Sequence, residues 1–91
     1  NINASLIVVK IDDLNFKFFE STITYLEGLE QLFELDGKYY FGKLYYNDDG
    51  SGFFVTNNNV TKFSKKQAKT IIVIGMLLAN LQKEYELEDF L

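Results

Sequence analysis

The amino-acid sequence predicts an α+β fold, in which an antiparallel sheet of four or five strands packs on one long C-terminal helix. Two observations support this class. Residues 64–83 combine a helix start signal with a long apolar run, and residues 5–63 hold several short β-branched or aromatic runs separated by turn residues. The length of 91 residues is enough for one modest core. We therefore expect a single domain over residues 1–91.

The long helix is expected over Ser64–Lys83. Ser64 can cap the first turn, and Gln67, three residues later, stands where the second member of a capping box belongs. Its centre, Ile71–Ala79, is apolar without a break. Because a helix that is apolar on all sides must be covered on more than one side, the sequence allows a homodimer through this helix.

The first two strands are expected at the start of the chain. Ser5–Ile11 is a β-branched run of strand length, and the Asp12-Asp13 pair after it is a turn signal. From Leu14 to Phe18 apolar and polar residues alternate, which is typical of a half-buried strand. These two strands are expected to pair as a hairpin.

A short helix is expected near residues 24–35. Leu26, Leu29, Leu32 and Phe33 are spaced at helical intervals, with Gly37 just past the end. Gly28 weakens the assignment, because glycine in a helix interior costs about 1 kcal/mol relative to alanine. The segment 31–35 could instead form a strand that turns at residues 36–37.

The central strand is expected at Lys38–Tyr46, which holds four of the six tyrosines. Gly42 within it indicates a bulge or a close approach of another group. Residues 47–52 form a turn into a strand at 53–56, and a short strand is expected at 60–63. The last residues, 84–91, are read as a helix extension or an acidic interaction tail.

Composition excludes several chemistries. The chain has no Cys, His, Trp, Pro or Arg. Disulfides, thiolate nucleophiles, zinc sites and histidine-dependent catalysis are therefore excluded, and neither an enzyme activity nor a cofactor is expected. Nine lysines against thirteen carboxylates give a net charge of −4, which disfavours direct nucleic-acid binding. No signal peptide or membrane span is recognised, and a cytoplasmic location in a bacterial host is expected.

Two sequence patterns resemble ligand-binding sites, but each has a simpler structural explanation. Asn47, Asp49, Ser51 and Gly52 match the first positions of a calcium loop, but residue 58 is Asn rather than the bidentate Glu, so a hairpin loop is favoured and no metal is expected. The aromatic ladder of residues 39–54 could stack single-stranded bases, but core packing and a protein interface are favoured because no basic groove accompanies it.

The run TKFSKKQAKTI, residues 61–71, follows an aromatic hairpin. This junction resembles one seen in many small proteins of phages and prophages of low-GC bacteria, and an Asn-, Lys- and Ile-rich composition fits such a source. The resemblance implies a small phage protein of the anti-CRISPR or other host-inhibiting type, which acts by binding. It assigns no functional residue.

The resulting hypothesis is a non-catalytic protein that inhibits or modulates a partner protein by docking on a basic site, one candidate being a site that otherwise binds nucleic acid. Tyrosines and complementary charge suit protein interfaces. An immunity protein that neutralises a toxin and a structural homo-oligomer are the alternatives. The expected partner-binding residues are Tyr39, Tyr40, Tyr45, Tyr46, Asp48, Asp49, Glu84, Glu86, Glu88 and Asp89.

Overall fold

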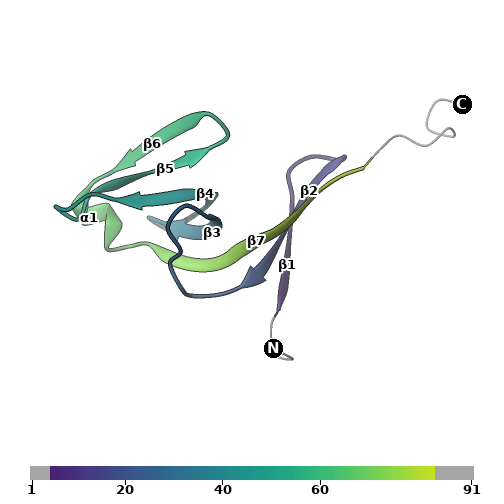
Figure 1. The fold of residues 1–91 in the computed structure, drawn as a ribbon, viewed down its shortest axis with the longest axis horizontal. Coiled ribbons are helices and arrows are strands. Elements are labelled where there is room, and N and C mark those ends of the chain that lie inside the picture. Colours follow the sequence, from purple (N-terminus) through teal and green to yellow (C-terminus); the bar gives the residue numbers. More distant parts are fainter. Residues whose placement is uncertain (1–4, 84–91) are drawn as a thin grey trace, which may run out of the picture.

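The computed structural model describes residues 5–83, which form one seven-stranded antiparallel sheet and a single short helix (Figure 1). The strands lie side by side in the order β1-β2-β7-β3-β4-β5-β6. Their bounds are β1 Leu6–Lys10, β2 Asn15–Ser21, β3 Glu30–Leu35, β4 Lys38–Tyr46, β5 Gly52–Thr56, β6 Asn59–Phe63 and β7 Ile72–Gln82, and helix α1 is Lys65–Ala68. The expected α+β fold is therefore wrong, because these residues are mostly β-structure.

Strands β3 to β6 form a meander of consecutive hairpins with tight turns. Asp36 and Gly37 connect β3 to β4 with positive φ angles of 50° and 78°, and Asn57 at φ 55° begins the turn from β5 to β6. After β6, α1 carries the chain back across the sheet, so β7 pairs with β3 at the other side of the meander.

Strand β7 joins the meander to the β1–β2 hairpin. Its first part, residues 72–76, pairs with β3, and residues 75–82 pair with β2. The register shifts between Leu32 and Phe33 on one side and between Phe18 and Phe19 on the other. Such irregularities bend a strand and increase its twist. In Figure 1, β7 accordingly curves from α1 to the hairpin, which lies beside the meander.

Gly75 lies where β7 is paired with both neighbours, opposite Leu32 of β3 and Ser21 of β2. A Cβ atom at this position would lie 3.0 Å from Cβ of Phe19 and 3.1 Å from the carbonyl oxygen of Glu20. The absence of a side chain lets the fully buried Phe19 pack directly on the β7 backbone.

The main core lies on one face of the meander. Phe33 and Leu44 are fully buried, and the Phe33 ring packs edge-on against Phe54 at 5.1 Å and stacks on Tyr40 at 6.0 Å. Helix α1 and the segment before β3 cover this face, since Ala68 and Tyr25 pack against the cluster. The remaining buried members are Leu35, Phe63 and Val73.

The expected helix over Ser64–Lys83 is wrong beyond its first turn. Its start is confirmed: the Ser64 hydroxyl accepts a hydrogen bond from the Gln67 N–H, and the Gln67 side chain accepts one from the Ser64 N–H. The helix ends at Ala68, however, and residues 72–82 form β7. A homodimer through an apolar helix is consequently not supported, because the chain contains no such helix in residues 5–83.

The expected helix near residues 24–35 is also wrong, and the alternative strand with a turn at residues 36–37 is confirmed as β3. Gly28 is in a turn at φ 81°, which an L-residue in a right-handed helix cannot adopt. The hairpin near the N-terminus, the central strand 38–46 and the strands near 53–56 and 60–63 are confirmed. The proposed tail 84–91 lies outside the described residues.

Candidate functional site

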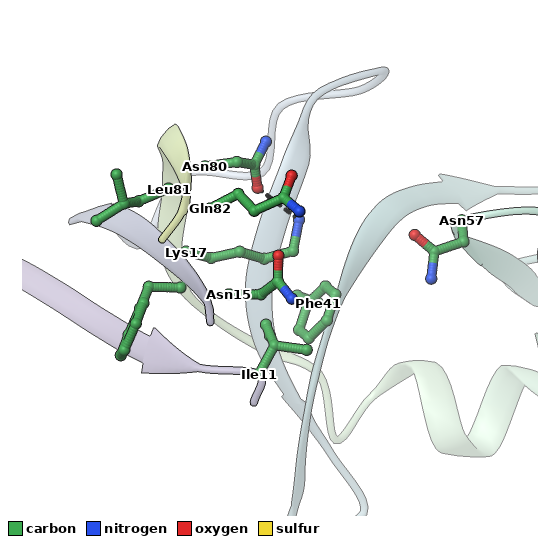
Figure 2. Close-up of a pocket in the computed structure, with 9 residues that line it drawn as sticks. Ile11, Asn15, Lys17, Phe41, Asn57, Asn80, Leu81 and Gln82 are labelled. Atoms are coloured by element: carbon green, nitrogen blue, oxygen red, sulfur yellow. Dashed lines mark hydrogen bonds between the residues drawn. The ribbon is translucent and has the colours of Figure 1, made fainter. Parts of the chain in front are cut away.

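A groove lies between the β1–β2 hairpin with the end of β7 on one side and β4 on the other. It consists of two hollows that meet at Phe41. The first, about 460 Å³, is lined mainly by residues of the hairpin and of β7 (Figure 2). The second, about 430 Å³, lies between β1 and the start of β4 and is the more apolar of the two. We call the two hollows together the Phe41 groove.

Phe41 is directed into the groove by the alternation of β4. Adjacent residues of a strand point to opposite faces, so Tyr40 lies in the core while Tyr39 and Phe41 lie on the opposite face. Leu32 is paired with Phe41 across the β3–β4 ladder and lines the second hollow. The groove is therefore the outer face of the β3–β4 pair, opposite the main core.

Lys17 links the hairpin to the floor of the groove. Figure 2 shows its side chain extending from β2 toward Phe41, with its ammonium 5.0 Å from the ring centroid and 2.8 Å from Oδ1 of Asn80. The same ammonium lies 2.9 Å from Oε2 of Glu30. A cation at this distance from an aromatic face is attracted by the ring quadrupole. Lys17 thus contacts both walls of the groove.

Glu30 and Lys17 neutralise one another below the surface. Their side chains are 23% and 16% exposed, and Oε2 of Glu30 is buried without a well-aligned hydrogen bond from any described residue. The ammonium contact is the main compensation for that oxygen. The charge of Lys17 is therefore not free to attract an anionic ligand. The other lysine of the groove, Lys10 in the second hollow, is paired with Asp13 at 2.9 Å, and the remaining lining is apolar, aromatic and amide.

The rim of the groove carries exposed apolar side chains. Tyr39 is 69% exposed beside the second hollow, and Ile11 is 44% exposed beside the first. Amide side chains complete the first hollow at Asn15, Asn57, Asn80 and Gln82. An aromatic floor with an apolar and amide rim is the composition typical of protein interfaces rather than of charged-ligand sites.

The four tyrosines expected to bind a partner do not form one surface. Tyr39 and Tyr45 lie on the groove side of β4, whereas Tyr40 and Tyr46 lie on the core side. Tyr45 stacks on Phe53 at 5.1 Å, and Tyr46 packs edge-on against Tyr25 at 5.0 Å. Tyr39 and Tyr40 line the second hollow of the Phe41 groove, at the end of β4 away from Tyr45 and Tyr46.

The expected carboxylate contacts are also separated from the groove. Asp48 and Asp49 lie exposed in the β4–β5 turn, where Oδ1 of Asp49 accepts hydrogen bonds from the Ser51 hydroxyl at 2.6 Å and the Ser51 N–H at 2.9 Å. These bonds, the hydroxyl bond first, lower the pKa of Asp49, and the positive charge of Lys65 adds to the effect. The other four residues, Glu84, Glu86, Glu88 and Asp89, lie outside the described part.

The residues of this turn that match a calcium loop form hydrogen bonds within the turn. Asn47 donates its side-chain amide to the Ser51 hydroxyl at 3.1 Å, and Ser51 is also bonded to Asp49. Within residues 5–83, no group of three or more potential ligand side chains is gathered where it could hold a metal ion.

Lys17 and Glu30 were not recognised from the sequence as functional residues. Lys17 stands at a polar position of an alternating strand, and Glu30 was placed in the expected helix. No local signal pairs two residues of opposite charge that are thirteen positions apart. Their contact depends on the order of β2, β7 and β3 in the sheet.

Comparison with known proteins gives no relative: no family model, no curated protein and no solved structure matches this chain. In the described range, no helix has the length and apolar character needed to cross a bilayer.

Proposed function

We propose that this protein is a non-catalytic binding protein that inhibits or modulates a partner protein, and that the partner inserts apolar side chains into the Phe41 groove. The observation that carries the proposal is the groove itself, a neutral depression with an aromatic floor at Phe41 and an exposed aromatic at Tyr39. Buried aromatic anchors in pockets, surrounded by a rim that excludes water, dominate the energetics of protein interfaces.

A second contact with a basic partner is favoured by the distribution of charge. All nine lysines fall within residues 5–83 together with nine of the thirteen carboxylates, so this part of the chain is formally neutral. The net charge of −4 comes from Glu84, Glu86, Glu88 and Asp89. We propose that these four carboxylates steer a basic site of the partner toward the protein, because charge complementarity raises association rates.

The proposal can be tested by affinity capture from a low-GC bacterial lysate with the full chain and two variants. Tyr39→Lys combined with Ile11→Lys places a charge at the rim of each hollow, and Val60→Lys places one on the exposed β6 strand as a matched control. A partner that is retained by the wild type and the control but lost with the groove variant is expected. Binding is then measured with the purified partner by calorimetry.

The charge contact is tested separately with Glu84→Gln, Glu86→Gln, Glu88→Gln and Asp89→Asn combined. We expect a slower association rate with little change in dissociation, and a weaker dependence of the rate on salt. If the groove variant binds the purified partner as tightly as the wild type, the groove is not the binding surface and the proposal is wrong.

A further inference from the structure

Among residues 5–83, strand β1 is an edge of the sheet with no strand on its outer side. Its pairing with β2 determines which of its backbone groups point outward. Ser5 accepts a hydrogen bond from the Ser21 N–H at 2.8 Å, and the Ile11 N–H donates to the Asn15 carbonyl at 2.8 Å. In an antiparallel ladder the hydrogen-bonded pairs alternate, so the odd-numbered residues of β1 bond to β2. The N–H and C=O groups of Leu6, Val8 and Lys10 therefore point away from the sheet.

This edge exposes two large apolar side chains and has one charge, at its end, to oppose pairing with other chains. Leu6 and Val8 are 59% and 52% exposed on the same face, and β1 contains no proline or bulge. Its one charged residue, Lys10, is engaged by Asp13 at 2.9 Å. Edge strands in monomeric proteins are normally blunted by charge, proline or bulges.

The opposite edge of the sheet, β6, differs in composition. Its sequence is NVTKF, with Lys62 exposed and Phe63 turned into the core, and Val60 is the one exposed large apolar side chain. β6 therefore exposes one large apolar side chain, whereas β1 exposes two, Leu6 and Val8.

We propose that β1 pairs in antiparallel fashion with β1 of a second copy of this chain, across a twofold axis that passes through Val8. In this register Val8 faces Val8 of the second copy, and Leu6 faces Lys10. All three are outward-pointing residues, so the pairing forms about six backbone hydrogen bonds. It uses the whole of β1 and avoids placing Lys10 opposite itself.

The side chains on the exposed face are self-complementary in this register. Val8 lies beside Phe18, which lies beside Ala79. Pairing two copies therefore joins these residues and their symmetry mates into one continuous apolar row across the axis. Contiguous apolar cross-strand contacts are the unit that stabilises a sheet.

Charge is complementary across the same axis. Leu6 is paired with Glu20 in the hairpin, on the face that carries Lys10. Lys10 of one copy therefore lies two strands, about 10 Å, from Glu20 of the other, with the short gap filled by Leu6. Two long side chains can bridge this distance. The Lys10–Asp13 ion pair is exposed and therefore weak, so Lys10 can exchange it for Glu20 of the second copy, and each copy supplies one cation and one anion to a twofold-related pair of contacts. This surface is distinct from the helix that the sequence predicted to dimerise. Val8 and Lys10 also line the second hollow of the Phe41 groove, so a second copy paired at β1 borders the site proposed for the partner. The tests below use the chain without a partner, so the dimer and the proposed function can fail separately.

The first test is the mass in solution, measured by sedimentation equilibrium over a range of concentrations. We expect the wild type to approach twice the chain mass of 10.6 kDa and Val8→Lys, which places two ammonium groups face to face on the axis, to remain monomeric. Val60→Lys, on the other edge strand, is the matched control and should dimerise like the wild type. Circular dichroism verifies that each variant is folded.

The second test determines the register of the β1 pair by disulfide crosslinking. Because the chain has no cysteine, an introduced cysteine can crosslink only with another introduced one. Opposed residues in antiparallel strands are close enough for a disulfide. Val8→Cys should crosslink with itself under mild oxidation, whereas Val60→Cys should not. Leu6→Cys and Lys10→Cys should crosslink poorly alone and efficiently when mixed in equal amounts.

A wild type that stays monomeric at all concentrations overturns the inference. So does a folded Val8→Lys variant that dimerises like the wild type, since the interface then lies elsewhere. The register, and with it the axis at Val8, is rejected if Val8→Cys and Val60→Cys crosslink equally. It is also rejected if Leu6→Cys crosslinks as well alone as in the mixture with Lys10→Cys.

Discussion

Lys17 and Phe41 are in contact across the groove, with the ammonium of Lys17 5.0 Å from the centroid of the Phe41 ring. The two residues belong to strands β2 and β4, which are separated in the sheet by β7 and β3. A single side chain thus ties the hairpin to the meander. Because Lys17 also neutralises Glu30, its replacement removes both the contact with Phe41 and the counter-charge of Glu30.

The first prediction concerns this ion pair. Lys17→Met keeps most of the stem but leaves the Glu30 carboxylate without its cation, and we expect the free energy of unfolding to fall by about 2 kcal/mol, below the cost at fully buried pairs because both groups retain some solvent contact. Urea denaturation measures the loss. Adding Glu30→Gln should recover part of it, and a double variant no more stable than Lys17→Met alone would contradict the explanation.

The second prediction concerns Gln31, which is fully buried. Its Oε1 accepts a hydrogen bond from the Leu26 N–H at 2.9 Å, and its Nε2 donates to the Thr24 carbonyl at 2.7 Å. Gln31→Leu leaves both backbone groups without these partners, and we expect a loss of about 3 kcal/mol in denaturant unfolding. Faster amide exchange at Leu26 should accompany the loss.

A companion variant, Gln31→Glu, tests the donor separately. Its carboxylate can accept from Leu26 but cannot donate to Thr24 at neutral pH, and burial should raise its pKa in the folded state. A raised carboxyl pKa means that the folded state binds the proton more tightly, so the stability of this variant relative to the wild type should increase as the pH falls toward 4. A deficit independent of pH would contradict this role.

The third prediction concerns Tyr25, whose hydroxyl donates to the Leu44 carbonyl at 2.8 Å. Burial, followed by the negative charge of Glu27, raises the pKa of Tyr25 above its usual 10. Since the folded pKa exceeds the unfolded one, the stabilisation is complete below about pH 10 and is lost as the pH rises through the folded pKa. Tyr25→Phe should cost about 1 kcal/mol at pH 7 and reduce the loss of stability between pH 9 and 11.

Tyr46 provides the control for this titration, because burial raises its pKa too but no described group accepts a hydrogen bond from its hydroxyl. Tyr46→Phe should therefore leave the stability at pH 7 nearly unchanged. If Tyr25→Phe and Tyr46→Phe behave alike at neutral pH, the hydrogen bond to Leu44 is not a source of stability.

The fourth prediction concerns Gly52 at the start of β5. A Cβ atom there would lie 2.6 Å from Cζ of Phe63 and in collision with the carbonyl oxygen of Tyr45. We expect Gly52→Ala to lower the free energy of unfolding by about 3 kcal/mol. Gly37→Asn is the matched control: nothing lies within 4 Å of its Cβ position, and Asn tolerates the positive φ of 78°. A thermal melt that ranks these two variants equally would contradict the packing argument.

Strand assignments from the sequence were correct where alternation or turn residues marked both ends. The Asp12-Asp13 turn and the aromatic segment 38–46 are of this kind, and Asp12 indeed accepts hydrogen bonds from the N–H groups of Leu14 and Asn15. Of the two alternatives predicted for Gly42, a bulge or a close approach, the second is confirmed, since a Cβ atom there would lie 2.6 Å from the Val55 carbonyl oxygen.

The segment 71–79 could not be assigned by periodicity. A continuous apolar run fits both a buried helix and a central strand that is covered on both faces. The capping box at Ser64 biased the assignment toward a long helix, although four β-branched residues, 71–74, and Gly75 favoured a strand. The groove could therefore not be predicted from the sequence, because its walls depend on the position of β7 between β2 and β3.

The position of β7 in the sheet determines the order in which the chain can fold. β7 is the last strand along the described chain, yet it lies between two strands that are synthesised much earlier. The β3–β6 meander can fold from sequence-local contacts as it emerges from the ribosome, but the hairpin cannot be joined to it until residue 82 is available. Folding should therefore end in one slow, non-local closure step, and the flanks of β2 and β3 are exposed to aggregation until β7 is inserted.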